Sequence, residues 1–258
     1  MGFTAYFDAS GGSRQVANVV AGYLARVEDW ERFDCDWRLV LAHDNVPYFH
    51  MREFAHFKGP FMDWQGQDGR RANFLARLVG VCKDHLRCRV STIVLINDFT
   101  EVDQMYPLSE LLDSPYTLAA RTCAGKIREW MKANQYDEPV EHIFEDGDTD
   151  FNLGTLKKRF HSDGFSIPIF KPKKDERGIW LTPFQAADFA AWEFLKAINR
   201  AEAGLVKSLR DLRKSLLNLS TIPAADGTYG KEELIRMCKR IGLPVRSSLD
   251  TRSGEVKP

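Results

Sequence analysis

Short apolar runs separated by turn residues predict strands in the first part of the chain. Residues 3–8 form one run, which ends in an acid before Gly11 and Gly12, and residues 16–25 form a second run rich in Val and Ala. The glycines between the two runs fit a hairpin turn. Residues 37–42 alternate between apolar and polar side chains, which predicts a third strand. Three strands in succession predict an antiparallel meander.

Helical and strand patterns then alternate along the chain. Residues 47–64 are irregular and dense in aromatic side chains and His, so a structured loop is expected there. Apolar positions at helical spacing, or a proline at the start of such a segment, predict the helices, and short apolar runs predict the strands. The expected helices cover residues 71–86, 115–134, 152–161 and 181–200, and the expected strands cover residues 90–96, 139–144 and 167–170. After residue 204 we expect one or two amphipathic helices, with residues 223–230 as a break and a polar tail at the end.

This order of elements predicts an α/β fold. The first three strands form the antiparallel part of a mixed sheet, and the later alternation adds strands to it by right-handed βαβ crossovers. A mixed sheet of this kind with helices on its faces is the arrangement of an RNase H-like fold. We expect an RNase H-like domain over residues 1–202 and a C-terminal helical extension with a frayed tail over residues 203–258.

Composition places the chain among globular proteins. Of 258 residues, 44% are hydrophobic, which is enough for a sizeable core. Lys and Arg together number 36, as do Asp and Glu, so bulk charge does not indicate a nucleic-acid partner, although a local groove can still be basic. The five scattered cysteines fit a reducing compartment. With no basic-then-apolar leader and no apolar run of membrane-spanning length, we expect a cytoplasmic protein without a membrane partner.

Two acids of the first third of the chain stand in places where a reaction centre could use them. Asp8 comes at the end of the first predicted strand, next to the glycine turn. Glu53 follows His50 by three residues, so the two side chains would share one face of a helical turn. The alternatives are a turn-forming Asp that binds the following backbone amides, and a solvated Glu beside a core Met and Phe.

Two further acidic sites lie in the second half of the chain. Glu145, Asp146 and Asp148 follow a predicted strand directly, where a polar turn is the alternative interpretation. Asp188 lies on the predicted helix over residues 181–200, one turn from Trp192 and on or beside its apolar face. A carboxylate in such surroundings is expensive to bury unless it is paired, protonated or bound to a metal. The alternative is an Asp at the edge of that face, bonded to a neighbouring side chain or backbone group.

Taken in order, these acidic segments resemble the DUF3800 family of uncharacterised proteins. The resemblance spans roughly residues 3–200 and implies an RNase H-like fold with a nuclease-like architecture. The family usually has Glu after the first Asp, where this chain has Ala9. The matching segments are Phe7-Asp8-Ala9-Ser10-Gly11, His50-Met51-Arg52-Glu53, Phe144-Glu145-Asp146-Gly147-Asp148 and Gln185-Ala186-Ala187-Asp188.

The leading hypothesis is a divalent-metal-dependent nuclease or phosphodiesterase. Carboxylates that converge on one small volume can hold Mg²⁺ or Mn²⁺ against a phosphate, and the metal-bound water is then the nucleophile. His50 would orient this water or shuttle a proton. The expected ligands are Asp8, Glu53, Asp188 and either Glu145 or Asp146, the two acids closest to the strand end.

A basic segment before the Asp188 helix fits the same hypothesis. Lys171, Lys173 and Lys174 follow a predicted strand and would contact the phosphate backbone of DNA or RNA. His161 and Trp180 are nearby candidates for contact or stacking.

Two other functions stay open from the sequence. Ala9 and the zero net charge favour a non-catalytic interaction module, with phage defence or mobile elements as its context. A hydrolase of a small nucleotide or phosphate ester is the third alternative.

Overall fold

The computed structural model describes residues 2–12, 15–147 and 151–246, and these contain a six-stranded mixed sheet. Its strand order is β5-β4-β1-β2-β3-β6. Strand β2 is antiparallel to β1 and to β3, whereas β4 is parallel to β1, β5 to β4 and β6 to β3. The strands are β1 (Phe3–Gly11), β2 (Ala17–Arg26), β3 (Cys88–Leu95), β4 (Val140–Glu145), β5 (Ile169–Lys171) and β6 (Ala224–Tyr229).

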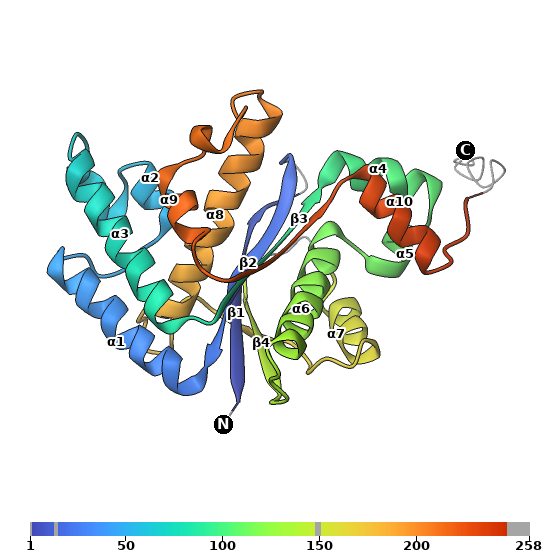
Figure 1. Cartoon of the computed structure of the whole chain (residues 1–258), viewed down its shortest axis with the longest axis horizontal. Helices are drawn as coiled ribbons and strands as arrows, with labels where there is room; N and C mark the ends of the chain where they lie inside the picture. Colours follow the sequence, from blue (N-terminus) through green and yellow to red (C-terminus); the bar gives the residue numbers. More distant parts are fainter. Residues whose placement is uncertain (1, 13–14, 148–150, 247–258) are drawn as a thin grey trace, which may run out of the picture.

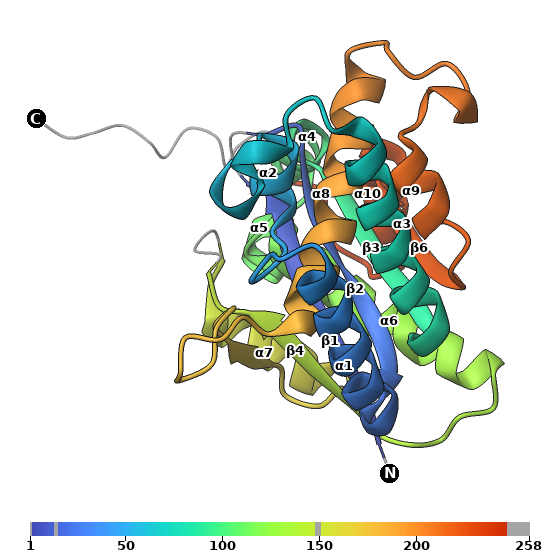
Figure 2. The same ribbon diagram turned by 90° about the vertical axis from the view of Figure 1, so that its left-hand side faces the viewer.

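Helices cover both faces of this sheet (Figure 1). One face carries α1 (Val27–His43), α2 (Met51–Ala55), η1 (Gly59–Trp64), α3 (Asp68–His85), α8 (Thr182–Glu202) and α9 (Lys214–Leu219), with η2 (Leu209–Asp211) after α8. The other face carries α4 (Ile96–Met105), α5 (Leu108–Leu112), α6 (Pro115–Ala133), α7 (Leu153–Ser162) and α10 (Lys231–Arg240). Figure 2 views the first face, where α1, α3 and α8 lie over the strands.

Each face of the sheet has its own hydrophobic core. Side chains of a strand point alternately to the two faces, so Phe3, Ala5 and Phe7 of β1 enter the core beneath α6, while Tyr6 packs into the core beneath α8. The same alternation turns Asp8 toward α8, because it stands two residues after Tyr6. The first functional candidate is therefore directed at the helix that carries Asp188.

The α/β fold with a mixed, helix-flanked sheet is confirmed. Three neighbouring antiparallel strands form its centre, but the predicted meander of three consecutive strands is wrong, because α1, α2, η1 and α3 lie between β2 and β3. The third of these strands is Cys88–Leu95 and not residues 37–42, which lie inside α1. The alternation of that segment misleads because Leu39 is 63% exposed, whereas Trp37 and Leu41 are buried. The buried side chains of α1 recur at helical spacing, which only a longer window shows.

Two other expectations about elements were wrong, and two helices were not predicted. The expected loop over residues 47–64 contains α2 and η1, and α4 and α5 occupy residues 96–112, where no helix was expected. The expected break over residues 223–230 is strand β6, which pairs with β3. Its sequence Ala-Ala-Asp-Gly-Thr-Tyr is weak as a strand by propensity, so the pairing with β3 determines its conformation.

The other expected elements match the structure. The helices expected over residues 71–86, 115–134, 152–161 and 181–200 correspond to α3, α6, α7 and α8. The segment after residue 202 contains helices, as expected, but also this sixth strand of the sheet. The division into two domains stays a prediction. In the part of the chain that the structure describes, no helix is long and apolar enough to cross a membrane.

Candidate functional site

The sheet topology brings the ends of β1 and β4 together. Phe7 and Phe144 are partners in the parallel pairing of these strands. The next residue of each strand, Asp8 and Glu145, therefore lies at the same end of the pair. Strand β5 adds to β4 in the same direction and leads into the connection to α8. The carboxyl ends of parallel strands are a common place for ligand sites.

Asp8 is buried and faces a lysine. Its side chain is 2% exposed, and its Oδ1 accepts a hydrogen bond of 2.8 Å from the backbone N–H of Ala9. Its Oδ2 lies 3.2 Å from the Nζ of Lys173. The carboxylate is therefore a local turn acceptor, as one interpretation of the sequence expected, and also the buried half of an ion pair with a partly exposed lysine.

Asp188 and Gln185 hold the segment that carries His50. Asp188 Oδ2 accepts a hydrogen bond of 2.7 Å from the backbone N–H of Met51, the first residue of α2. One turn earlier on α8, Gln185 Oε1 accepts from the backbone N–H of Phe49 at 2.7 Å and from the indole of Trp37 at 3.1 Å. The Gln-Ala-Ala-Asp segment thus fixes the backbone on both sides of His50.

His50 lies between two carboxylates without a close hydrogen bond to either. Its Nε2 is 3.7 Å from Asp188 Oδ1, and its Nδ1 is 3.7 Å from Glu53 Oε1. Glu53 is fixed from its other side, since Tyr48 donates a hydrogen bond of 2.8 Å to its Oε2. Distances of 3.7 Å are too long for hydrogen bonds. His50 is therefore placed beside the acids, and its Nδ1 is buried without a hydrogen-bond partner.

A glycine makes room for Glu53. Gly59 has a φ of +55°, and a Cβ at this position would lie 2.5 Å from Glu53 Oε2 and 3.1 Å from the hydroxyl of Tyr48. Both its backbone conformation and this close approach require glycine.

Of the three acids after β4, Glu145 belongs to the site. It is half-buried at the end of the strand and interacts electrostatically with Lys173 and Asp188. Asp146 is exposed, and its backbone N–H donates to the carbonyl of Lys171 at 2.8 Å. Asp148 lies outside the described residues.

The three lysines of the predicted basic segment point to different surroundings. Lys173 is 27% exposed and lies among the carboxylates of Asp8, Asp188 and Glu145. Lys171 is exposed on β5, and the Nζ of Lys174 lies 4.8 Å from the ring centre of Trp180. Only Lys171 and Lys174 are therefore on the surface, where a nucleic-acid backbone would have access to them.

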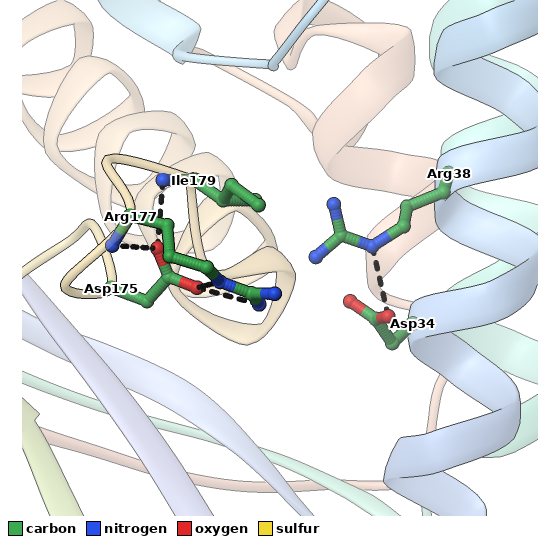
Figure 3. Close-up of polar contacts among 5 residues, drawn as sticks. All are labelled: Asp34, Arg38, Asp175, Arg177 and Ile179. Carbon is green, nitrogen blue, oxygen red and sulfur yellow. Dashed lines mark hydrogen bonds and ion pairs between the residues drawn. The ribbon is translucent and has the colours of Figure 1, made fainter.

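Residues 172–181, called here the strap, connect β5 to α8 past the acids. Lys174 and Trp180 form an antiparallel bridge, and the Trp180 ring stacks on Tyr48 with 4.4 Å between the ring centres. At the turn of the strap, Asp175 accepts hydrogen bonds of 2.9 Å from the backbone N–H groups of Arg177 and Ile179 (Figure 3). These contacts hold the strap as a closed hairpin against the His50 segment.

The strap is also held from α1. At its end, Thr182 donates a hydrogen bond of 2.6 Å to Asp34, which pairs with Arg38 through its other oxygen at 2.9 Å. The side chains of Arg38 and Arg177 extend toward each other across the space between α1 and the strap (Figure 3).

Burial dominates the protonation of the site. It raises the pKa of both Asp8 and Asp188 to about 6, against the opposing effect of Lys173. Burial also lowers the pKa of Lys173, but Asp8, Asp188 and Glu145 outweigh this effect, and its pKa is raised overall. The pKa of His50 is lowered, first by burial and then by Lys173. At neutral pH the lysine is therefore charged, and His50 is neutral and able to accept a proton.

The sequence predicted a site of Asp8, His50, Glu53, Asp188 and either Glu145 or Asp146. The structure brings the first four and Glu145 near one another at the carboxyl ends of β1 and β4, whereas Asp146 is exposed. Sequence reasoning missed the inward direction of Lys173 and the anchoring by Tyr48 and Gln185. No signal in the sequence separates Lys173 from Lys171 and Lys174, which follow the same predicted strand. Among residues 2–12, 15–147 and 151–246, no group of three or more His, Cys, Asp or Glu side chains is arranged to hold a metal ion.

Comparisons with known proteins returned no match among protein-family models, curated proteins or solved structures. The resemblance to the DUF3800 family therefore stays a prediction from the motifs.

Proposed function

We propose that this chain is a hydrolase of phosphodiester bonds, a nuclease of RNase H-like type, with its reaction centre at Asp8, Asp188, Glu145 and His50. The observation that carries the proposal is the burial of Asp8 from β1 and Asp188 from α8 around one lysine at the end of the central strands. Burial deprives these two carboxylates of hydration, and buried carboxylates with a raised pKa are typical of functional sites.

The sheet supports the RNase H-like part of this proposal. Strands β1, β2 and β3 are antiparallel neighbours, and β4 and β5 extend the sheet from β1 in parallel. This is the order expected of an RNase H-like core, with β6 as an addition next to β3.

The donor chemistry fits one magnesium or manganese ion. Mg²⁺ is usually bound through one or two carboxylates, with water and phosphate oxygens in its other positions, so it does not need three protein ligands. Asp8 Oδ2 and Asp188 Oδ1 would hold it, since their second oxygens already accept backbone hydrogen bonds. When bound, the ion would supply charge for the phosphate and a more acidic water.

His50 would act on the proton of the attacking water. Hydrolysis forms a bond between the water oxygen and phosphorus and breaks one ester P–O bond, so the water must lose a proton. The lowered pKa of His50 keeps the ring neutral at pH 7, and Gln185 and Asp188 hold the backbone on both sides of it beside the acids. Its role is therefore that of a general base.

The surroundings of the centre support a nucleic acid as the polymer. Lys171 and Lys174 are exposed on the strap side, and Arg38 and Arg177 add two guanidinium groups between α1 and the strap. Such residues would neutralise backbone phosphates on a chain whose net charge is zero.

The proposal is tested by incubation of the full chain with single- and double-stranded DNA and RNA in Mg²⁺ or Mn²⁺, and again with EDTA. We expect cleavage that EDTA abolishes and that Asp8→Asn and Glu145→Gln reduce at least about a hundredfold. Asp146→Asn is the matched control, because Asp146 is the exposed neighbour of Glu145. Absence of cleavage, or full activity of Asp8→Asn, would contradict the proposal.

A non-catalytic interaction module is the second candidate. The observation that favours it is that Asp188 already serves as the acceptor for the first N–H of α2, a purely structural use. A calorimetric titration with Mn²⁺ separates the two, because the module predicts no heat of binding. A hydrolase of small nucleotides, the third candidate, predicts activity on nucleotides and none on polymers.

A further inference from the structure

We propose that Lys173 is a built-in second cation of the centre, whose ammonium takes the place of a second divalent ion, so that the chain binds one such ion and not two. This inference rests on the proposed function and deepens it.

The first support is the position of the ammonium. The Nζ of Lys173 lies 3.2 Å from Asp8 Oδ2 and also interacts with Asp188 and Glu145, which come from two other elements. In a two-metal site the ions stand about 3.5–4 Å apart and share a carboxylate between them. A cation this close to Asp8 occupies the space that a second ion would need.

The second support is that the lysine is fixed in place. The carbonyl of Lys173 accepts a hydrogen bond of 2.9 Å from the N–H of Leu181, and the adjacent Lys174 bridges to Trp180. Trp180 in turn stacks on Tyr48 next to His50. The strap therefore fixes the backbone at Lys173 in a closed hairpin, and the ion pair with Asp8 directs its side chain to the acids.

The third support is the balance of charge. The ammonium is paired with Asp8 at 3.2 Å and interacts electrostatically with two further carboxylates, those of Asp188 and Glu145. One lysine and one divalent ion neutralise these three negative charges, whereas two divalent ions beside the lysine would leave a positive excess in a buried site. Uncompensated charge is unfavourable where water is excluded.

The test is a calorimetric titration of the full chain with Mn²⁺ alone, which needs no substrate. We expect one Mn²⁺ per wild-type chain. Lys173→Met removes the charge and keeps much of the side-chain length, so we expect a second bound Mn²⁺ or a first ion bound at least about tenfold more tightly. Lys173→Arg keeps the charge and should bind one ion. Lys158→Met, an exposed lysine of α7, is the control and should titrate like the wild type.

Every outcome of this titration decides the inference. Two Mn²⁺ ions on the wild type overturn it, as does an unchanged titration of Lys173→Met. Unfolding temperatures show whether Lys173→Met is folded. If it is not, Lys173→Gln, which also removes the charge, replaces it in the titration. Cleavage is measured separately. If the wild type cleaves nothing but Lys173→Met gains Mn²⁺, the nuclease is refuted and the role of the lysine as a cation stands. If the wild type cleaves nucleic acid but Lys173→Met titrates like the wild type, the nuclease stands and the role of the lysine is refuted.

Discussion

The carboxylate of Asp188 and the backbone N–H of Met51 are joined by a hydrogen bond of 2.7 Å, which ties helix α8 to the segment that carries His50. This contact gives one acid two uses. It anchors the start of α2 through Oδ2, and it leaves Oδ1 facing the centre at 3.7 Å from His50. The consequences of burying a charge for this purpose are measurable.

Asp188→Asn should stabilise the metal-free protein at pH 8. The amide oxygen keeps the hydrogen bond from Met51, while the buried charge disappears. Because the pKa of Asp188 is raised to about 6 in the folded chain, its ionisation destabilises the fold as pH rises through this value. We expect a gain of about 1–3 kcal/mol in the free energy of unfolding at pH 8, measured with urea.

The gain should vanish near pH 4, where the folded protein carries a protonated Asp188 and the variant has no advantage. A variant that is less stable than the wild type at pH 8 would show that the charge is compensated better than its burial indicates.

Metal affinity should fall as pH falls through about 6. Asp8 and Asp188 must be ionised to bind a cation, and the pKa of each is raised to about 6 by burial. Calorimetric titrations with Mn²⁺ at pH 5, 6, 7 and 8 would show a steep loss at the two lower values. An affinity that is constant down to pH 5 would mean that these carboxylates titrate at ordinary values near 4 or do not bind the ion.

Gln185→Ala should destabilise the protein by about 2–4 kcal/mol, because it leaves two buried donors without an acceptor, the N–H groups of Phe49 and of the Trp37 indole. Gln104→Ala, at an exposed position of α4, is the control and should stay within about 0.5 kcal/mol of the wild type. Equal urea midpoints for the two variants would refute the anchoring role of Gln185.

Gly59→Ala should disturb Glu53 and with it His50. The new Cβ would stand 2.5 Å from Glu53 Oε2, and the residue would also be strained by its φ of +55°. Gly66→Ala separates these effects, since Gly66 has a φ of +77° with nothing within 4 Å of the added Cβ. We expect Gly66→Ala to lose stability only, about 1–2 kcal/mol, and to keep its activity.

Gly59→Ala should lose more stability than this and should also lose cleavage. Equal effects of the two substitutions on cleavage would show that the contact between Gly59 and Glu53 has no functional weight.

The sequence predicted the acids of the site better than the elements that carry them. Asp8 stood out because ligand sites are common at strand ends. Asp188 stood out because a carboxylate on an apolar helix face is costly to bury unless it is paired or binds a ligand. The strand expected over residues 37–42 was wrong because Trp37, Leu39 and Leu41 alternate with other residues in the sequence, as they would in a strand. In the structure Trp37 and Leu41 are buried at helical spacing and Leu39 is exposed.

Lys173 could not be separated from Lys171 and Lys174 by sequence. Which of three nearby lysines turns inward depends on the bridge between Lys174 and Trp180 and on the stacking of Trp180 on Tyr48. These contacts join segments far apart in the chain. Strand β6 was missed for a similar reason, since its pairing with β3 is a tertiary effect on a weak strand sequence.

The most direct test of the central claim is cleavage of a labelled nucleic acid by the purified chain in Mg²⁺ or Mn²⁺, with Asp8→Asn alongside. We predict cleavage by the wild type that stops on addition of EDTA and is at least about a hundredfold slower in the variant. No cleavage of DNA or RNA by the wild type, or equal rates for the wild type and Asp8→Asn, would contradict the assignment of this acid centre as a nuclease site.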